Sequence, residues 1–405
     1  MLKQTRFWTQ IVAFFLIYVN KSTKSRGNLF NNRTEFIRDS RDYNRGVRSS
    51  VGCPLIPMCQ WARYQELPIK MDQGSRSSVS MLVDNYNQEP VVKKIFTDKT
   101  DFMTEMKALS CIRIGHNPWL VNPVCADPMK MTMVLEWGGD GDLTKWNIFG
   151  DKFQPYSYDD VVEISAQMVA AVAATHRRGF VHGDLKPENF TINTQEKKIK
   201  LIDFGLSAKI GEYRIMAQGT PQTMSPEVAF DDFFDNQIYA TDPKISTSSF
   251  KNEWPSNPAA ASLNNTKLRP QFIQESMDWW SLGVSLHYIF AKYFDEHEEA
   301  FVDSSSSEDS DDQDNSIADE KYYKSDDQYF PYKVIFAEND EIIDFRYRPI
   351  PAAFTSELRS LLDKLMTWIP EKRNFKRKRL FEEICQHEFF RRINWDRIDP
   401  NLKAF

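Results

Sequence analysis

Two short motifs carry most of the polar side chains that could do chemistry. Residues 182–189 read HGDLKPEN, and the triplet 203–205 reads DFG after a stretch that alternates like a hairpin. Such a hairpin would place two carboxylates and an amide on adjoining turns. One carboxylate can accept the proton of a substrate hydroxyl, while the other carboxylate and the amide oxygen can hold Mg²⁺ against phosphate groups. This pattern therefore indicates phosphoryl transfer.

The two motifs resemble the catalytic and metal-binding loops of eukaryotic protein kinases. The resemblance covers most of the chain, from about residue 63 to residue 392. It implies that Asp184 is the catalytic base, that Lys186 contacts the transferring phosphate and that Asn189 and Asp203 bind Mg²⁺. Lys186 also resembles the serine/threonine subclass rather than the tyrosine subclass. The implied cofactors are ATP and Mg²⁺, and the implied partners are protein substrates with Ser or Thr hydroxyls.

Residues earlier in the chain resemble the nucleotide site of that family. Lys93 resembles the strand lysine that contacts the phosphates, with Lys94 as the rival, and Lys93 is preferred because Val91 would then lie against the adenine. Glu105 resembles the helix partner of that lysine. The hinge, where backbone groups would recognise adenine, is identified as Leu135, Glu136 and Trp137, with Leu135 as gatekeeper.

The glycine-rich loop of the family is degraded in this chain. Asp72, Gly74 and Ser77 stand at the three glycine positions, and Val79 keeps the apolar contact. Glycines at these positions let backbone amides approach the phosphates. The carboxylate of Asp72 is expected to weaken ATP binding.

Later motifs resemble the end of the activation segment and the residues that support it. Thr220 would hydrogen-bond near Asp184 and help to seat a hydroxyl substrate. Asp278 resembles the helix residue that holds the catalytic loop backbone, and Arg373 resembles the partner of Glu227 in a buried ion pair.

Gly183 stands where many members of the family carry an arginine before the catalytic aspartate. In the family that arginine pairs with a phosphorylated activation loop. We therefore predict that activity does not depend on phosphorylation of this segment.

The elements that must position these residues can be read from hydrophobic periodicity. Alternation predicts strands, and a spacing of three to four predicts helices. The expected strands cover 67–72, 78–84, 90–96, 120–124 and 131–135, and the expected helices cover 101–112 and 158–178. Ser157 is expected to cap the second helix, and Gly179 to follow its end. The predicted fold class is α+β, with a small β-rich lobe that includes one key helix and a large α-helical lobe.

The expected organisation has four parts and two insertions. Residues 1–20 are predicted to be a signal peptide or short anchor, 21–60 an arginine-rich polar linker, 61–137 the first lobe and 138–400 the second. Two polar insertions are expected at about 230–274 and 303–328. Their composition cannot bury enough apolar surface to fold, so both are expected to be mostly disordered.

The first residues predict where the chain is sent. An apolar run at 11–19 follows Lys3 and Arg6, as in a signal peptide, and it is short for a membrane span. We expect a secretory or secreted protein, with membrane anchoring as the alternative. The arginine-rich stretch 21–50 suggests contact with a membrane surface. These features together resemble the secreted rhoptry-type kinases of apicomplexan parasites, which would place the protein in a parasite secretory organelle.

Composition excludes other classes. The 405 residues carry a formal net charge of −6, which argues against general nucleic-acid binding. The five cysteines lack the repeated spacing of a zinc site. One or two disulfides are expected if the protein is secreted, with the pairing left open. The cysteines are Cys53, Cys59, Cys111, Cys125 and Cys385.

Two alternatives to an active kinase remain at this point. A pseudokinase scaffold would explain the degraded glycine loop, and a nucleotide sensor would bind ATP without transfer. The five retained residues Lys93, Asp184, Lys186, Asn189 and Asp203 favour the enzyme, because a scaffold has no chemical need for all of them.

Overall fold

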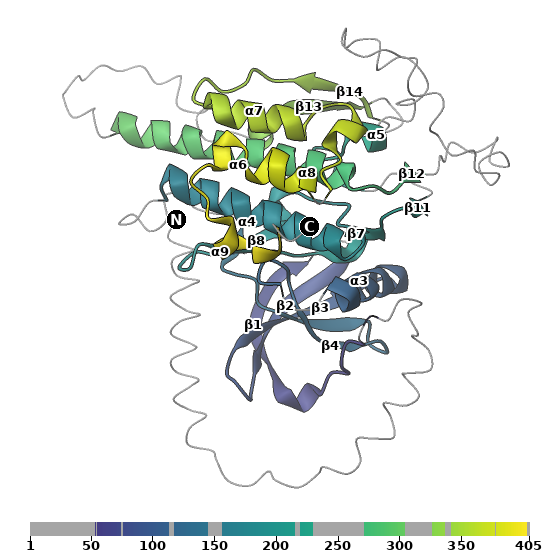
Figure 1. Ribbon diagram of the computed structural model, residues 1–405. Helices are drawn as coiled ribbons and strands as arrows, with labels where there is room; N and C mark the ends of the chain where they lie inside the picture. The colour runs from purple at the N-terminus through teal and green to yellow at the C-terminus, as the bar shows by residue number, and fades with distance from the viewer. Residues whose placement is uncertain are drawn as a thin grey trace, which may run out of the picture. The chain divides into compact units, whose positions relative to one another are not determined.

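The computed structural model describes residues 53, 55–73, 76–112, 117–144, 156–214, 219–229, 271–303, 326–336, 342–376 and 378–402. These residues form two compact units, one with residues up to 97 and 124–136, the other with 98–123 and 137 onward (Figure 1). The first is β-rich and the second mainly helical, so the predicted α+β class is confirmed. The expected signal peptide, the arginine-rich arm 21–50 and most of both insertions lie outside the described residues.

The first unit is built on a five-stranded sheet with the order β1-β2-β3-β5-β4. The pairs β1–β2, β2–β3 and β3–β5 are antiparallel. All five strands were predicted, with ends that differ by a few residues. The strands are β1 Tyr64–Gln73, β2 Ser77–Asp84, β3 Pro90–Phe96, β4 Pro123–Asp127 and β5 Thr132–Glu136.

A segment expected to be linker is in fact part of the first unit. We call residues 56–63 the N-terminal strap. Met58 forms a parallel bridge with Ala126 of β4, supported by Cys59 N–H donating to Ala126 O at 3.1 Å. Cys59 is disulfide-bonded to Cys125, also in β4. The strap therefore extends the sheet beyond β4 and is joined to it covalently.

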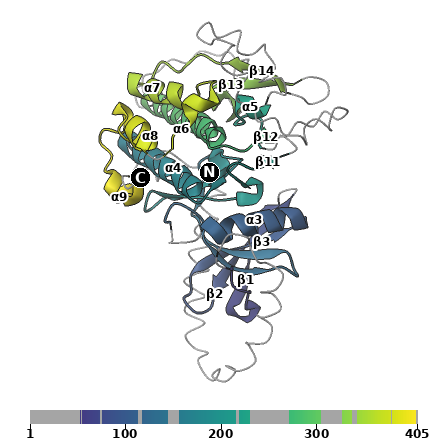
Figure 2. The ribbon, with the colours of Figure 1, turned by 45° about the vertical axis from the view of Figure 1, so that its right-hand side comes forward.

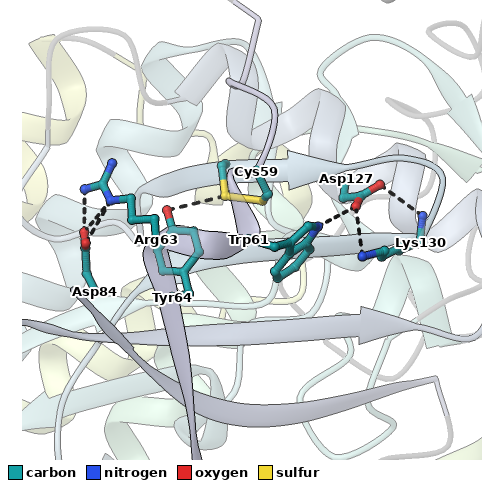
Figure 3. The surroundings of a disulfide bond; sticks show 8 residues. Cys59, Trp61, Arg63, Tyr64, Asp84, Asp127 and Lys130 are labelled. Carbon is teal, nitrogen blue, oxygen red and sulfur yellow. Dashed lines mark hydrogen bonds and ion pairs between the residues drawn. A yellow bond between two sulfur atoms is a disulfide. The ribbon is translucent and has the colours of Figure 1, made fainter. Parts of the chain in front are cut away.

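Polar contacts continue along the strap after the disulfide (Figure 3). Trp61 Nε1 donates to Asp127 Oδ2 at 2.7 Å, and the Arg63 guanidinium pairs with the buried carboxylate of Asp84 at the end of β2. Tyr64 then begins β1. The strap covers one face of the sheet, where Cys59 and Trp61, together with Tyr64 of β1, pack on Leu82, Val91, Cys125 and Val134.

The second unit contains helix α3, Lys99–Ile112, which was expected to belong to the small lobe. Its buried face includes Phe102, Glu105, Met106 and Leu109. This face contacts the short 3-10 turn Phe204–Leu206 of the second unit. Contact with that turn places the helix in the helical unit.

Two long helices form the centre of the second unit. Helices α4, Tyr158–Arg177, and α6, Ser276–Asp303, lie side by side in both ribbon views (Figures 1 and 2). Trp279 and Trp280 of α6 are completely buried. The other helices are α5 Pro226–Ala229, α7 Ser356–Leu365, α8 Lys378–Leu380 and α9 Trp395–Ile398. Within the residues described, no helix is both long and apolar enough to span a membrane.

The predicted start and end of α4 are confirmed. Ser157 Oγ accepts from Asp160 N at 3.2 Å, and the Asp160 carboxylate accepts from Ser157 N at 2.8 Å. This reciprocal pair is a capping box, which satisfies backbone donors that the first turn cannot use. Gly179 follows the helix with φ +78°, a conformation that favours glycine.

Short strands complete the second unit and lie next to the predicted motifs. Strand β6, Gly141–Asp142, pairs with β8, Phe190–Asn193, and β8 pairs with β9, Lys198–Leu201. Three further two-stranded sheets pair β7 with β10, β11 with β12 and β13 with β14. Their bounds are β7 Phe180–Val181, β10 Ala208–Lys209, β11 Tyr213–Arg214, β12 Gln271–Phe272, β13 Tyr332–Phe336 and β14 Ile342–Tyr347.

The predicted ion pair between Glu227 and Arg373 is confirmed. Arg373 Nη2 lies 2.6 Å from Glu227 Oε2, and both side chains are buried. Arg373 also donates to the Ser276 and Thr367 carbonyls, both at 2.6 Å. The pair thus ties α5 to the start of α6, and its charges are satisfied as a buried pair requires.

Candidate active site

The loop after β7 is held by a carboxylate of α6. Asp278, only 1% exposed, accepts from His182 N at 2.7 Å and from Gly183 N at 3.0 Å. Burial raises the pKa of this carboxyl, but the His176 hydrogen bond at 2.8 Å, the positive potential of His176 and His182 and the Gly183 N–H together hold it below its usual value. The predicted role of Asp278 as the anchor of this loop is confirmed.

Three polar side chains meet in front of this anchored loop. Lys186 Nζ donates to Thr220 Oγ1 at 2.8 Å and lies 3.0 Å from Asp184 Oδ2. The Thr220 hydroxyl donates to Asp184 Oδ1 at 2.8 Å. The expected contact between Thr220 and Asp184 is therefore confirmed. We call Asp184, Lys186 and Thr220 the polar triangle.

Gly219 lets the activation segment approach the loop closely. It has φ +137°, and a Cβ atom added there would lie 3.3 Å from the Gly183 carbonyl oxygen. A larger residue would therefore be strained in its backbone and crowded against the loop. This close approach brings Thr220 within reach of Asp184.

The β8–β9 hairpin places the two expected metal ligands. Asn189 is 5% exposed, and its side chain donates to the Asp184 carbonyl at 2.8 Å. Ile202 N, next to Asp203, donates to the Asn189 carbonyl at 2.9 Å. Asp203 has a left-handed backbone with φ +61° and accepts from Gly205 N at 3.4 Å. The hairpin thus brings Asn189 and the Asp-Phe-Gly turn together beside Asp184, as predicted.

The donor set fits Mg²⁺. A carboxylate oxygen from Asp203 and an amide oxygen from Asn189 are hard ligands, and Mg²⁺ in nucleotide sites uses few protein ligands together with phosphate and water oxygens. The Asn189 amide nitrogen is used as a donor, which leaves its oxygen as the group for a cation. Among the described residues, no group of three or more His, Cys, Asp or Glu side chains could hold a metal.

Glu105 lies beside the Asp-Phe-Gly turn. It is completely buried on α3, and one of its carboxylate oxygens is 3.5 Å from the position that a Cβ on Gly205 would take. Phe204 is also fully buried and packs edge-on against the His182 ring at 4.9 Å. The pairing of Glu105 with a lysine of β3 stays a prediction.

The register of the first sheet divides the expected nucleotide-contacting residues between its two faces. Residues directly opposite on paired strands share a face, and neighbours along a strand alternate. Leu135 is opposite Val92, and Val79 is opposite Lys94. We call this the Leu135 face. It includes Val79, Met81, Val92, Lys94, Phe96, Met133 and Leu135.

Val91 and Lys93 lie on the opposite face, which the N-terminal strap covers. Val91 packs under the strap with Leu82 and Val134, and the Lys93 amine pairs with the carboxylate of Glu66. The hydrogen bond from Lys93 lowers the pKa of Glu66. The prediction that Val91 and Lys93 act together with Val79 and Leu135 is therefore wrong, because alternate residues of β3 point to opposite faces.

Lys94 and Val92 are the residues that sequence reasoning passed over. Lys94 is 8% exposed and its Nζ lies 5.0 Å from the centre of the Phe96 ring. Two adjacent lysines cannot be told apart by composition, but the register distinguishes them. Leu135 is opposite Val92, and Lys94, two residues after Val92, lies on the same face. Of the remaining predicted residues, Glu136 ends β5 and Trp137 follows it. Gly74 lies outside the described residues, between β1 and β2.

Comparison with known proteins agrees with these motifs. Residues 67–242 match the protein kinase domain family. Over 176 residues the chain is 32% identical to maternal embryonic leucine zipper kinase of Xenopus tropicalis, covering 41% of this chain and 26% of that protein. Over 174 residues it is 31% identical to human calcium/calmodulin-dependent protein kinase type IV, covering 41% of this chain and 36% of that protein.

The chain thus spans only about a quarter to a third of the length of these relatives. The solved structure of the Cydia pomonella granulovirus kinase PK-1 superimposes with a TM-score of 0.49 and 18% identity, covering 81% of this chain and 95% of that one. The narrower resemblance to rhoptry-type kinases is untested by these comparisons and stays a prediction. From this match and these relatives, residues 67–242 belong to the protein kinase domain family.

Proposed function

We propose that the chain transfers the terminal phosphoryl group of ATP to Ser or Thr hydroxyls of protein substrates. The observation that carries this proposal is the polar triangle of Asp184, Lys186 and Thr220 beside the hairpin that bears Asn189 and Asp203. A carboxylate, a cation and two metal ligands are the groups that this reaction requires of the protein.

Each group in the triangle has a role in the proposed transfer. The Asp184 carboxylate orients the substrate hydroxyl and accepts its proton as the oxygen attacks. Lys186 stabilises the negative charge on the transferring phosphate. The Thr220 hydroxyl bonds both Asp184 and Lys186 and so holds their side chains in position. Mg²⁺, bound by Asn189 and Asp203, would neutralise the phosphates of the nucleotide.

We assign Lys94, rather than Lys93, as the β3 lysine that contacts the nucleotide phosphates. Lys94 shares a face with Val79 and Leu135, the two other residues expected to contact the nucleotide. Val92 then takes the position against the adenine that was expected for Val91. Lys93 is on the strap face, where Glu66 already pairs with its charge.

Labelled-phosphate transfer to a generic basic protein tests the enzyme against a pseudokinase scaffold. Transfer should be present in the wild type and lost in Asp184→Ala. Asp159→Asn is the matched control, because Asp159 is an exposed carboxylate paired only with Arg392 among the contacts described. Equal background in wild type and Asp184→Ala would support the scaffold. A rise in melting temperature with ATP and Mg²⁺, without transfer, would indicate a nucleotide sensor.

Phosphorylation of the activation segment is not required in this proposal. Gly183 supplies no cation for a phosphate, and the end of the segment is held instead by Ser281 Oγ, which donates to the Thr223 carbonyl at 2.7 Å. Replacing each Ser, Thr and Tyr between Asp203 and Glu227, apart from Thr220, should leave the transfer rate intact. Complete loss of activity from one such change in a folded protein would refute this.

We also propose that the chain works in an oxidising compartment, in the secretory pathway or after secretion. Disulfides persist mainly in such compartments, and the bond between Cys59 and Cys125 fits one. Cys53 and Cys111 are disulfide-bonded as well. Mass analysis of the mature N-terminus from expressing cells tests the proposal. An intact N-terminus on a reduced cytosolic protein would contradict it, and an intact N-terminus on membranes would favour the anchor.

A further inference from the structure

Three residues just before α6 pair with the activation segment. The register of β11 with β12 places Tyr213 opposite Phe272 and Arg214 opposite Gln271. Beyond the strands, Gly211 N donates to Ile273 O and Ile273 N donates to Glu212 O, both at 2.9 Å. These residues were expected to be part of a disordered insertion. We call Gln271, Phe272 and Ile273 the activation-segment clamp.

The Ile273 side chain joins parts of the site that are distant in sequence. It is 2% exposed and packs with Val181, Val228 and Met277. Val181 immediately precedes the catalytic loop, and Val228 follows the Ser-Pro-Glu end of the activation segment. The partly buried members of the same cluster are Ala208, Ile210 and Met224. Residues near both ends of the segment therefore pack in one apolar cluster, to which the clamp contributes Ile273.

The cluster reaches the polar triangle directly. A cavity of about 20 Å³ is lined by residues of both groups, Asp184 and Thr220 of the triangle and Ile273 and Met277 of the cluster. A space of this size holds about one water molecule at most. Shortening Ile273 would enlarge this cavity, which Thr220 also lines, and Thr220 bonds both Asp184 and Lys186.

We propose that the clamp holds the activation segment in its substrate-binding conformation without phosphorylation, with Ile273 as the positioning residue. This inference rests on the proposed function. Backbone pairing fixes residues 211–214, and apolar burial fixes the two ends of the segment. Packing thus holds the segment in place, as a phosphate–arginine pair does in kinases that carry the arginine. Because the segment carries Thr220, the clamp acts on binding of the protein substrate rather than on binding of ATP.

Steady-state kinetics of the full chain test this role. Ile273→Ala should raise KM for the basic protein substrate and lower kcat/KM by about tenfold, equivalent to 1.4 kcal/mol, with KM for ATP unchanged. Ile273→Val, which keeps most of the apolar contact, should retain most of the activity. Ile384→Ala is the matched control, because Ile384 is completely buried in Phe381–Cys385, whose residues are not among those of the Ile273 cluster.

The control separates positioning from simple loss of stability. Ile384→Ala should lower the melting temperature as Ile273→Ala does, but both of its KM values should stay at the wild-type level. If Ile273→Ala keeps the wild-type KM for protein substrate, or loses only kcat in step with its melting temperature, the positioning role is overturned.

Hydrogen exchange provides a readout that does not depend on activity. Exchange of the amides in 206–214 should rise in Ile273→Ala and stay unchanged in Ile384→Ala. An inactive wild type with this exchange pattern would overturn the proposed function but keep the clamp. An active wild type whose 206–214 exchange is unchanged by Ile273→Ala would overturn the clamp alone.

Discussion

At the scale of single residues, we propose different roles for two adjacent lysines on β3 because they point to opposite faces. Lys94 is buried on the face that holds Val79 and Leu135, and Lys93 is bonded to Glu66 under the strap. The sequence predicts a lysine at this place but cannot choose between the neighbours, because the choice depends on pairing with a strand some forty residues later. This is where sequence reasoning failed at the site.

The two lysines form a matched pair of variants. Lys94→Met should lower the transfer rate about a hundredfold, as expected when one charged group that stabilises the transition state is removed. Lys93→Met should leave transfer close to wild type, because it breaks only an ion pair whose Glu66 side is largely exposed. Rates measured with labelled ATP would contradict the assignment if Lys93→Met were the inactive variant.

His287 should make the fold sensitive to acid. It is buried on α6, its Nδ1 bonds the Tyr329 carbonyl at 2.9 Å, and burial lowers its pKa to about 4. The unfolded chain, with an ordinary histidine pKa of about 6.5, binds this proton more readily than the folded chain does. The contribution of neutral His287 to the free energy of unfolding is therefore fully present above pH 6.5. It falls by about 3 kcal/mol as the pH drops towards 4.

The variant His287→Asn tests this link, since an amide can keep a hydrogen bond to the carbonyl without titrating. The difference in free energy of unfolding between wild type and variant should shrink between pH 7 and pH 4. Parallel stability curves for the two proteins over that range would show that His287 does not cause the acid sensitivity.

At the scale of elements, regular hydrophobic periodicity predicted the five strands of the first sheet and the helices α3 and α4. The β1–β5 strands and α4 follow the expected ranges closely, including the Ser157 cap. Two elements could not be predicted. The strap begins inside the segment expected to be linker, and the clamp lies inside an expected insertion. Both are held by partners distant in sequence, Cys125 for the strap and Val181 for the clamp. The composition around these residues does not predict contacts with partners so distant in sequence.

The disulfide of the strap should stabilise the first unit substantially. It closes a loop between residues 66 apart in sequence, for which chain entropy predicts about 4 kcal/mol. Replacing both Cys59 and Cys125 by alanine should lower the free energy of unfolding by that order. Either single replacement should cost about the same as the double one, since each breaks the same bond. Unchanged denaturation midpoints would mean that the strap stays in place without it.

At the scale of the whole molecule, the order of the motifs along the chain is what made the family predictable. The loop 182–189, the Asp-Phe-Gly turn, the Ser-Pro-Glu end and Asp278 occur in one sequence order, and the structure brings them together in one unit. The contact between Thr220 and Asp184 was predicted correctly because it follows from motifs whose spacing is nearly fixed. The proposed compartment rests on cysteine pairing, which the sequence left open.

The central claim is that Asp184 serves as the base for transfer of phosphate from ATP to a protein hydroxyl. The most direct measurement compares wild type with Asp184→Asn, which keeps the size of the side chain but loses its basicity. We predict that labelled-phosphate incorporation falls about a hundredfold or more, while the rise in melting temperature with ATP and Mg²⁺ is unchanged. Equal incorporation by both proteins, or none by the wild type, would contradict the account.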